Sequence, residues 1–336
     1  MDRSNRRSVV SGLAALALVL ALLYIVFRDK LPDIIESAVS VSLSGLLVLL
    51  AMGFVYQLID AAMCMVLLRS RLPELTYRQA FELTFLGVFG LVCSGGAITI
   101  PMQSFYLKRC GLDVGHSVGL LILKFVYHKS AMLLYALVML IPGLRWLDTF
   151  LPKARFYVLP GVLVCLLIIA ALVLLCTWAP VRSMAEKLTG KLPDRGKWPE
   201  RKTKWLSQLD LMYTEAGHLK ARRDVSVKVM LLNLLKFTVL YLIPSAALLA
   251  MGRNAPDVWH SLVLSSMMLL ISGVLPHVNG IGPLEFAFVF FYSTVAGNIA
   301  ASGAMLLYRI ATYFFPFLLS LPVFIAVQHR LSSGRM

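Results

Sequence analysis

The chain has 336 residues, of which 59% are hydrophobic and 15% are charged, and its formal net charge is +15. Ordinary soluble domains carry about a quarter of their residues as charged side chains, so this composition excludes a soluble globule. About 20 apolar residues in a helix cross the hydrocarbon core of a bilayer, and several such runs are present. The sequence therefore predicts an all-α polytopic membrane protein with a single membrane domain over residues 1–336.

The first apolar run, residues 8–27, follows three arginines and precedes Arg28. It is longer than the apolar region of a secretion signal, and no small-x-small cleavage site stands before Arg28. We interpret it as a retained first span. A second run, residues 39–68, contains a single charge, Asp60, and is predicted to return the chain to the side on which it began.

The next apolar unit, about residues 80–110, is interrupted at Ser94-Gly95-Gly96. The positive-inside rule puts both Arg78 before this unit and the basic segment 179–228 in the cytoplasm. Three apolar units lie between these two points, and an odd number of crossings does not return the chain to the same side. We therefore predict that the broken unit is a re-entrant helical hairpin, entering and leaving on the cytoplasmic side.

Two full spans are predicted next, at about residues 114–144 and 156–181, and the basic segment 179–228 follows them. An apolar repeat at steps of four and three residues predicts an amphipathic helix at about 203–221 in this segment. Its members are Trp205, Leu209, Met212, Ala216 and Leu219. This helix is expected either to lie on the inner leaflet or to pack against the cytoplasmic end of the bundle. The segment has no nucleic-acid-binding motif, so we expect no nucleic acid partner.

After a span at about 229–251, a second broken unit runs from residue 258 and is interrupted by glycines and prolines over 273–283. The last span is predicted at about 300–327. Cytoplasmic N- and C-termini require the second unit to enter and leave from the outside. The result is about six full spans with two opposed re-entrant hairpins, in an inverted repeat of about 79–144 and 258–328. Such repeats are typical of transporters with a site near the bilayer midplane.

Charged side chains inside the predicted spans are the strongest functional signal. Four are cations: Lys124, Lys129, Lys236 and Arg309. Three acids lie at membrane depth: Asp60, Glu82 and Glu285. A lysine or arginine at the centre of a membrane helix costs about 2.5–3.5 kcal/mol. One interpretation is structural ion pairing, with Glu285 as the mate of Lys129 or Arg309. The other is a net positive interior that binds an anionic group such as a lipid phosphate.

Further candidates for headgroup binding lie beside these cations and at the helix breaks. His128 shares a helix face with Lys124 at i,i+4, and Gln103 follows the first break. Backbone amides at the breaks can bind anions at half-helix N-termini; the candidate hairpin-tip residues are Gly95, Gly96, Gly280 and Gly282. There is no phosphate-binding loop, no metal-ligand cluster and no nucleophile motif, so we expect no enzyme activity, no metal and no cofactor.

Two groups of residues carry a resemblance to a known family. The first is Ser94-Gly95-Gly96, Pro101-Met102-Gln103, Tyr106-Leu107-Lys108 and Gly111; the second is Leu275-Pro276, Gly280-Ile281-Gly282, Glu285, Leu306-Leu307-Tyr308-Arg309 and Thr312-Tyr313. They resemble motifs of the lysylphosphatidylglycerol synthase transmembrane region, or flippase-like membrane proteins. Residues 97–100 interrupt the first motif, and residues 277–279 replace a Pro/Gly pair in the second.

The resemblance implies movement of a lipid between leaflets of the cytoplasmic membrane. In well-known family members this region precedes a soluble aminoacyltransferase domain. This chain ends shortly after its last predicted span, so we expect a stand-alone flippase or scramblase-like transporter of an anionic-headgroup or aminoacylated lipid. Its expected partners are membrane lipids and, as a candidate, a separate lipid-modifying synthase. The alternatives are an ion-coupled transporter of a small anionic solute and, less favoured, an intramembrane lipid-modifying enzyme.

Overall fold

The computed structural model describes residues 36, 39–150, 154–178, 180, 183, 184, 187, 198–274 and 282–332. In this part of the chain all regular secondary structure is helical, and four helices are long and apolar enough to cross a membrane. The prediction of an all-α polytopic membrane protein is confirmed. The first predicted span, residues 8–27, lies outside the described residues, and the number of complete crossings stays a prediction.

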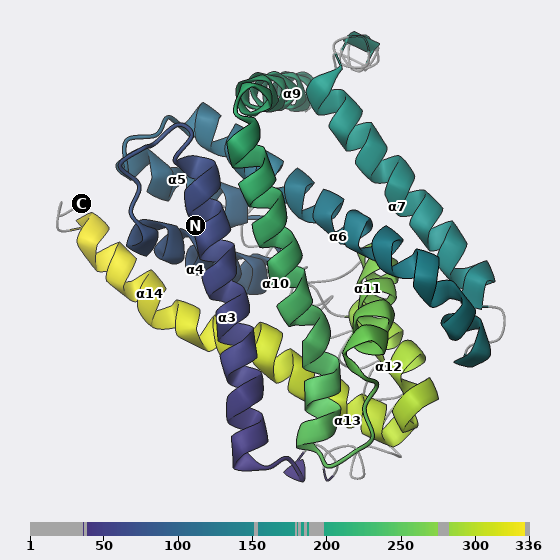
Figure 1. Ribbon diagram of the computed structural model, residues 1–336. Helices are drawn as coiled ribbons and strands as arrows, with labels where there is room; N and C mark the ends of the chain where they lie inside the picture. Colours follow the sequence, from purple (N-terminus) through teal and green to yellow (C-terminus); the bar gives the residue numbers. More distant parts are fainter. Residues whose placement is uncertain are drawn as a thin grey trace.

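Two long helices run side by side in opposite directions through the molecule (Figure 1): α3, Leu43–Leu68, and α10, Arg223–Ala250. The two helices are close together where α3 begins and α10 ends. There the Ser42 amide donates a hydrogen bond to the Ala250 carbonyl over 3.3 Å. A Cβ atom on Gly45 would lie 2.6 Å from the Ala250 side chain. Glycine at this position therefore permits the close approach of the two helices.

The first broken unit forms two short helices, α4 (Tyr77–Ser94) and α5 (Thr99–Arg109). Thr76 begins α4 with a capping box, and Gly95 ends it in the left-handed conformation, at φ 63°. A helix of 11 residues is only about 16 Å long, so α5 is too short to cross a bilayer. The pair packs together and lies toward the end of the molecule that carries α9 (Figure 1).

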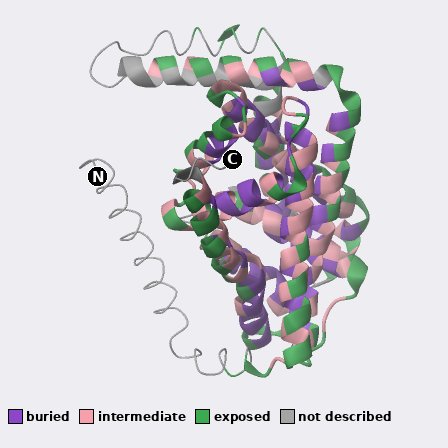
Figure 2. Cartoon of the chain, turned by 90° about the vertical axis from the view of Figure 1, so that its left-hand side faces the viewer, coloured by how far each residue is buried: buried purple, intermediate pink, exposed green. Residues whose placement is uncertain are grey.

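The middle of the chain forms α6 (Val114–Phe150), α7 (Ala154–Thr177) and α9 (Trp198–Ala221). Helix α9 contains the segment predicted as an amphipathic helix and lies across one end of the molecule (Figures 1 and 2). The side chains of Trp205, Leu209 and Met212 lie outside the described residues.

One face of α9 packs on the bundle, whereas its position relative to the inner leaflet stays a prediction. A Cβ atom on Gly119 of α6 would lie 2.8 Å from the Glu215 side chain and 3.0 Å from the Leu211 carbonyl oxygen. Gly115, one turn earlier, faces Leu211 at a similar distance. These two glycines let α9 come close to α6, so α9 is packed under the bundle along this face.

The second broken unit forms α11 (Val258–Val274) and α12 (Pro283–Ala296), at the end of the molecule away from α9 (Figure 1). Asp257 caps α11: its carboxylate accepts the His260 amide over 2.9 Å, and this hydrogen bond lowers the pKa of Asp257. The residues between the two helices, 275–281, lie outside the described part of the chain, and with them Gly280.

The last span consists of α13 (Asn298–Arg309), the π-helical turn η2 (Ile310–Phe314) and α14 (Phe315–Ser332). Helix α14 packs on α4, whereas α6 packs on α11. Each broken pair therefore contacts the long span that follows the other pair. This exchange fits the inverted repeat that the sequence predicts.

Exposed and buried residues divide as expected for a helical bundle in lipid (Figure 2). The buried core consists of aromatic and aliphatic side chains such as Phe237, Tyr241 and Phe288, each with no exposed surface. Large apolar side chains such as Leu318 and Ile325 are instead more than half exposed on the outer helix faces. Exposed apolar side chains on the outer faces suit contact with acyl chains.

Candidate functional site

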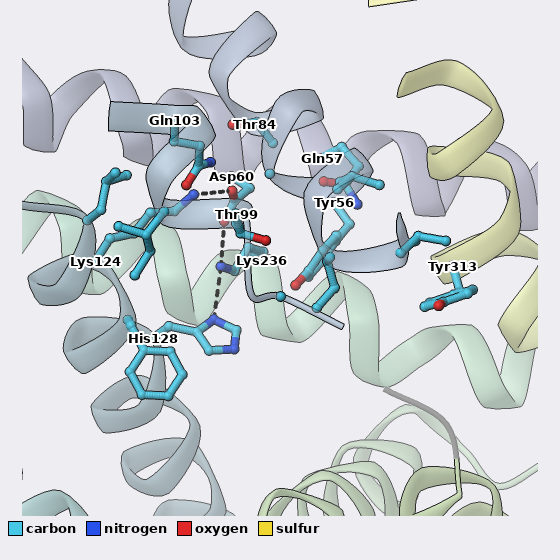
Figure 3. A pocket seen from close by; sticks show the side chains of 18 of the residues that line it. Tyr56, Gln57, Asp60, Thr84, Thr99, Gln103, Lys124, His128, Lys236 and Tyr313 are labelled. Atoms are coloured by element: carbon cyan, nitrogen blue, oxygen red, sulfur yellow. Dashed lines mark hydrogen bonds and ion pairs between the residues drawn. The ribbon is translucent and has the colours of Figure 1, made fainter. Parts of the chain in front are cut away.

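A cavity of about 540 Å³ lies between α3, the α4–α5 pair, α6, α10 and η2. Polar and charged side chains from several of these helices point into it (Figure 3). Five of the residues predicted to bind the headgroup or to form the hairpin tips line this cavity: Lys124, His128, Lys236, Gln103 and Gly96. Helices far apart in the sequence thus bring four of the seven predicted headgroup-binding residues to one place, whereas Lys129, Arg309 and Glu285 are not among the residues that line the cavity.

One carboxylate in the cavity wall binds two lysines. Lys124 of α6 lies 2.7 Å from Asp60 Oδ2, and Lys236 of α10 lies 2.8 Å from Asp60 Oδ1. The Lys236 side chain is 1% exposed, and those of Lys124 and Asp60 are 18% and 13% exposed. Two ammonium groups and one carboxylate leave a net charge of +1. An anion placed beside this cluster would neutralise the remaining charge.

His128 is hydrogen-bonded inside the same cluster. Its Nδ1 atom lies 3.1 Å from the Lys236 ammonium nitrogen, and its ring packs on Phe237 with 4.9 Å between centroids. A charged lysine has only hydrogens to donate, so Nδ1 accepts and the ring hydrogen lies on Nε2. His128 thus orients Lys236 and keeps one N–H group for another partner.

Gln103, which was predicted to bind the headgroup, lines the cavity but also forms a hydrogen bond within the protein. Its side-chain nitrogen donates to the Leu83 carbonyl over 2.9 Å, and the side chain is 5% exposed. A Cβ atom on Gly87 would lie 2.5 Å from the same nitrogen. Gln103 therefore fastens α5 to α4 across a glycine, and this contact fixes the shape of the cavity wall.

The glycines of the first break turn the chain at the cavity. Gly95 and Gly96 have φ values of 63° and 95°, a conformation that favours glycine. Gly96 lines the cavity, whereas Gly95 is not among the lining residues. At the second break, the Gly282 amide donates to Glu285 over 2.6 Å, so this amide is already used within the protein. Whether any of these amides binds a headgroup stays a prediction.

A second charged pair lies at the start of the π-helical turn. Arg309 donates from Nε to Glu285 Oε1 over 2.6 Å, and its Nη2 atom lies 2.5 Å from the same oxygen. The guanidinium also lies 5.4 Å from the Tyr313 ring centroid, and Tyr313 lines the cavity. Structural pairing of Glu285 with Arg309, one of the two mates expected from the sequence, is present.

Lys129 lies on a different side of α6 from Lys124 and is not among the residues that line the cavity. Its amino group lies 5.6 Å from the Phe125 ring centroid and faces Gly273 of α11, where an added Cβ atom would be 3.3 Å away. Within the described ranges no carboxylate forms an ion pair with it.

Glu82 is not a mate of the four cations. Its carboxylate binds Arg78 at 3.0 Å and Arg330 at 2.7 Å, and it accepts a 2.7 Å hydrogen bond from Tyr106. These partners come from α4, α14 and α5. Among the described residues, Asp60 and Glu285 are therefore the acids that pair with these cations, so two acids rather than three stand against the four cations.

Sequence reasoning missed the uncharged polar residues that α3 contributes to the cavity. Gln57 of α3 lines the cavity, is 6% exposed, and forms no hydrogen bond with the residues that the structure describes. Tyr56 lines the cavity as well, 5.5 Å from the Lys236 ammonium. The signal was available, because Gln57 and Asp60 stand at i,i+3 in an otherwise apolar span and so share a helix face.

Comparison with known protein families supports the motif resemblance. The family described as "Lysylphosphatidylglycerol synthase TM region" matches residues 11–320, which is most of the chain. A comparison with curated proteins found no significant match.

Proposed function

Because the chain belongs to the lysylphosphatidylglycerol synthase TM region family, we propose that it moves a lipid between the leaflets of the cell membrane. The lipid headgroup, anionic or aminoacylated, would enter the cavity while the acyl chains stay in the bilayer. The N- and C-termini would lie in the cytoplasm. The lipid would be moved without chemical change, as a flippase or scramblase does, and a separate synthase would supply any aminoacylated lipid.

The charge of the cavity supports binding of a phosphate group. Asp60 is shared between Lys124 and Lys236, and the remaining charge of +1 equals the charge that a phosphodiester would neutralise. Lysine is a common ligand of phosphate in proteins. Charge-assisted hydrogen bonds are worth about 1.5–3 kcal/mol each, which is enough to offset part of the cost of bringing a phosphate to membrane depth.

The exposed apolar residues of the cavity wall favour a lipid over a small solute as the substrate. Leu91 and Phe125 line the cavity, yet they are 40% and 51% exposed. The apolar side of the cavity is therefore not sealed by the described helices. An amphiphile matches this arrangement, because its headgroup reaches the lysines while its chains lie along the apolar side.

The proposal is tested by following a fluorescent lipid in vesicles that contain the purified protein. We use phosphatidylglycerol labelled on an acyl chain and add dithionite, which bleaches only the label in the outer leaflet. Label in the inner leaflet is expected to become accessible in vesicles with protein and to stay protected in vesicles without it. Equal protection in both kinds of vesicle would refute lipid movement.

Charge removal in the cavity provides the matched comparison. Lys236→Met is expected to slow lipid movement about tenfold or more, the equivalent of one charge-assisted hydrogen bond. Lys228→Met removes a lysine from an exposed position on the same helix and is expected to leave the rate unchanged. Uptake of a small water-soluble anion by the vesicles, without lipid movement, would favour a solute transporter instead.

A further inference from the structure

We propose that the cavity selects a headgroup combining one phosphate with uncharged hydroxyl groups, such as a glycerol or sugar phosphate, and that Gln57 hydrogen-bonds those hydroxyls. This inference rests on the proposed function and narrows its substrate. It excludes headgroups that carry a free amine, including aminoacylated ones. The reasons lie in which binding groups of the cavity are already used by the protein and which are not.

Carboxylates, the usual partners of an ammonium group, are not free in this cavity. Asp60 is the one acidic residue among the described residues that line it. Both of its oxygens are already bound, to Lys124 and to Lys236. An incoming amine would have to displace a buried lysine, and the displaced charge would lose its partner.

Aromatic rings are the second means of binding a cation, and those of the cavity face cations of the protein. The ring centroid of Tyr56 lies 5.5 Å from the Lys236 ammonium, and that of Phe125 lies 5.6 Å from Lys129. Tyr313 lies 5.4 Å from the Arg309 guanidinium. Each ring therefore has a positive group against it, and a second cation at the same ring would be repelled.

Neutral hydrogen-bonding groups, by contrast, have capacity left. The Gln57 amide has two donor hydrogens and an acceptor oxygen, faces the cavity and has no hydrogen bond within the described ranges. The hydroxyls of Thr84 and Thr99 in the same wall are buried without a partner. A buried polar group without a partner is costly. A ligand hydroxyl, which both donates and accepts, satisfies the amide better than an ammonium, which only donates.

These observations divide the cavity into two parts (Figure 3). Lys124 and Lys236 supply a site for a negative group, and the Gln57 amide supplies a site for uncharged oxygens. A polyol phosphate carries both features in one headgroup. A lysylated headgroup carries two ammonium groups against one phosphate and would bring positive charge into a cluster that is already positive.

The test compares four acyl-labelled lipids in vesicles containing the wild-type protein. They are phosphatidylglycerol, phosphatidic acid, phosphatidylethanolamine and lysylphosphatidylglycerol. Phosphatidylglycerol is expected to cross at least tenfold faster than either amine-bearing lipid, and faster than phosphatidic acid, which has no polyol. Equal or faster movement of lysylphosphatidylglycerol would overturn the inference while leaving lipid movement itself in place.

Substitutions at Gln57 test whether this side chain hydrogen-bonds the headgroup hydroxyls. Gln57→Leu is expected to lower the phosphatidylglycerol rate to that of phosphatidic acid and to leave the latter unchanged. Gln57→Glu adds a free carboxylate, so it is expected to slow phosphatidylglycerol and speed phosphatidylethanolamine. The controls are Gln328→Leu and Gln328→Glu, at an exposed position of α14. An equal effect of Gln57→Leu on all four lipids would show a structural role and refute selection by Gln57.

A soluble ligand separates this inference from the proposed function. If no lipid moves but the vesicles take up glycerol 3-phosphate in preference to phosphoethanolamine, lipid movement is refuted and the selection of polyol phosphates stands. If neither lipid nor glycerol phosphate moves, both proposals are refuted.

Discussion

Asp60 is the residue on which the charged cluster depends, because two lysines from different helices share its carboxylate. Removing one partner of a buried ion pair commonly costs about 3–5 kcal/mol, since it leaves an uncompensated buried charge. The lysines would then have no carboxylate in the cavity wall as described. The cluster is thus both a candidate binding site and a structural requirement for packing α3, α6 and α10 together.

We expect Asp60→Asn to lower the thermal unfolding midpoint of the detergent-purified protein strongly, by the equivalent of about 3–5 kcal/mol. Asp257→Asn, at an exposed cap where asparagine works as well as aspartate, is the control and should change stability by less than about 0.5 kcal/mol. The double variant Asp60→Asn with Lys236→Met should be less destabilised than the sum of its single changes. Additive effects would show that Asp60 and Lys236 are not coupled.

For single residues, the sequence identified which charged side chains lie in the membrane, but it did not identify which of them pair with one another. It singled out all four membrane cations and both acids that bind three of them. Which acid binds which cation depends on helices that are separated by 64 and 176 positions in the chain, and no sequence periodicity relates them. Gln57 carries no charge and so was not predicted, although its position three residues before Asp60 placed it on the same helix face.

No pattern in the sequence predicted the π-helical turn η2. It follows Arg309 directly and packs against α3, and a Cβ atom on Gly53 of α3 would overlap the Ala311 carbonyl group. Single π-helical turns are common at functional sites. A glycine opposite such a turn lets the helices touch, so the position of Arg309 depends on a residue far away in the sequence.

We expect Gly53→Ala to destabilise the protein by about 1–3 kcal/mol, because the added carbon meets backbone that has no rotamer to move. Gly217→Ala is the matched control: Gly217 lies on the exposed face of α9, and a Cβ atom there meets nothing within 4 Å. That change should stabilise by about 0.5–1 kcal/mol, since alanine is the better helix former. Thermal unfolding midpoints measure both, and a neutral Gly53→Ala would contradict the close packing.

Helix α9 is attached to the bundle through a buried acid. Glu215 has no exposed surface; it lies 3.1 Å from Arg71 and 2.6 Å from His116. The His218 side chain of α9 also contacts the Ser70 carbonyl at 3.2 Å, and so does Arg222, which lies between α9 and α10, at 3.5 Å. The sequence predicted this helix from its apolar repeat, but it gave no sign that the acid inside the repeat faces the bundle.

We expect Glu215→Gln to loosen α9 and to speed its cleavage by trypsin about tenfold, since it weakens charge-assisted hydrogen bonds worth about 1.5–3 kcal/mol. Glu74→Gln, at an exposed position in the loop before α4, should leave cleavage unchanged. Digestion of the folded protein over time, followed by mass spectrometry, measures both rates. Unchanged cleavage in Glu215→Gln would mean that the apolar face of α9 alone holds it.

For the whole molecule, the inverted repeat was predicted from two broken motifs and the parity of the spans. In the described helices, α4 and α5 lie toward one end of the bundle and α11 and α12 toward the other (Figure 1). Each pair packs on the long span of the other half. The contacts between halves were not predictable, because they depend on how four segments assemble rather than on any one of them.

Chemical labelling decides whether both broken units are re-entrant. Single cysteines, placed in a variant whose native cysteines are replaced, are labelled in sealed cells with a membrane-impermeant maleimide. If both hairpins enter and leave on one side, positions 254 and 298, which flank the α11–α12 pair, label from outside. Positions 74 and 113, which flank the α4–α5 pair, label only after the membrane is opened. All four positions are exposed, so protein packing does not block the reagent.

Labelling of positions 74 and 113 from opposite sides of the membrane would make the first unit a full crossing. The predicted count of six spans with two hairpins would then be wrong.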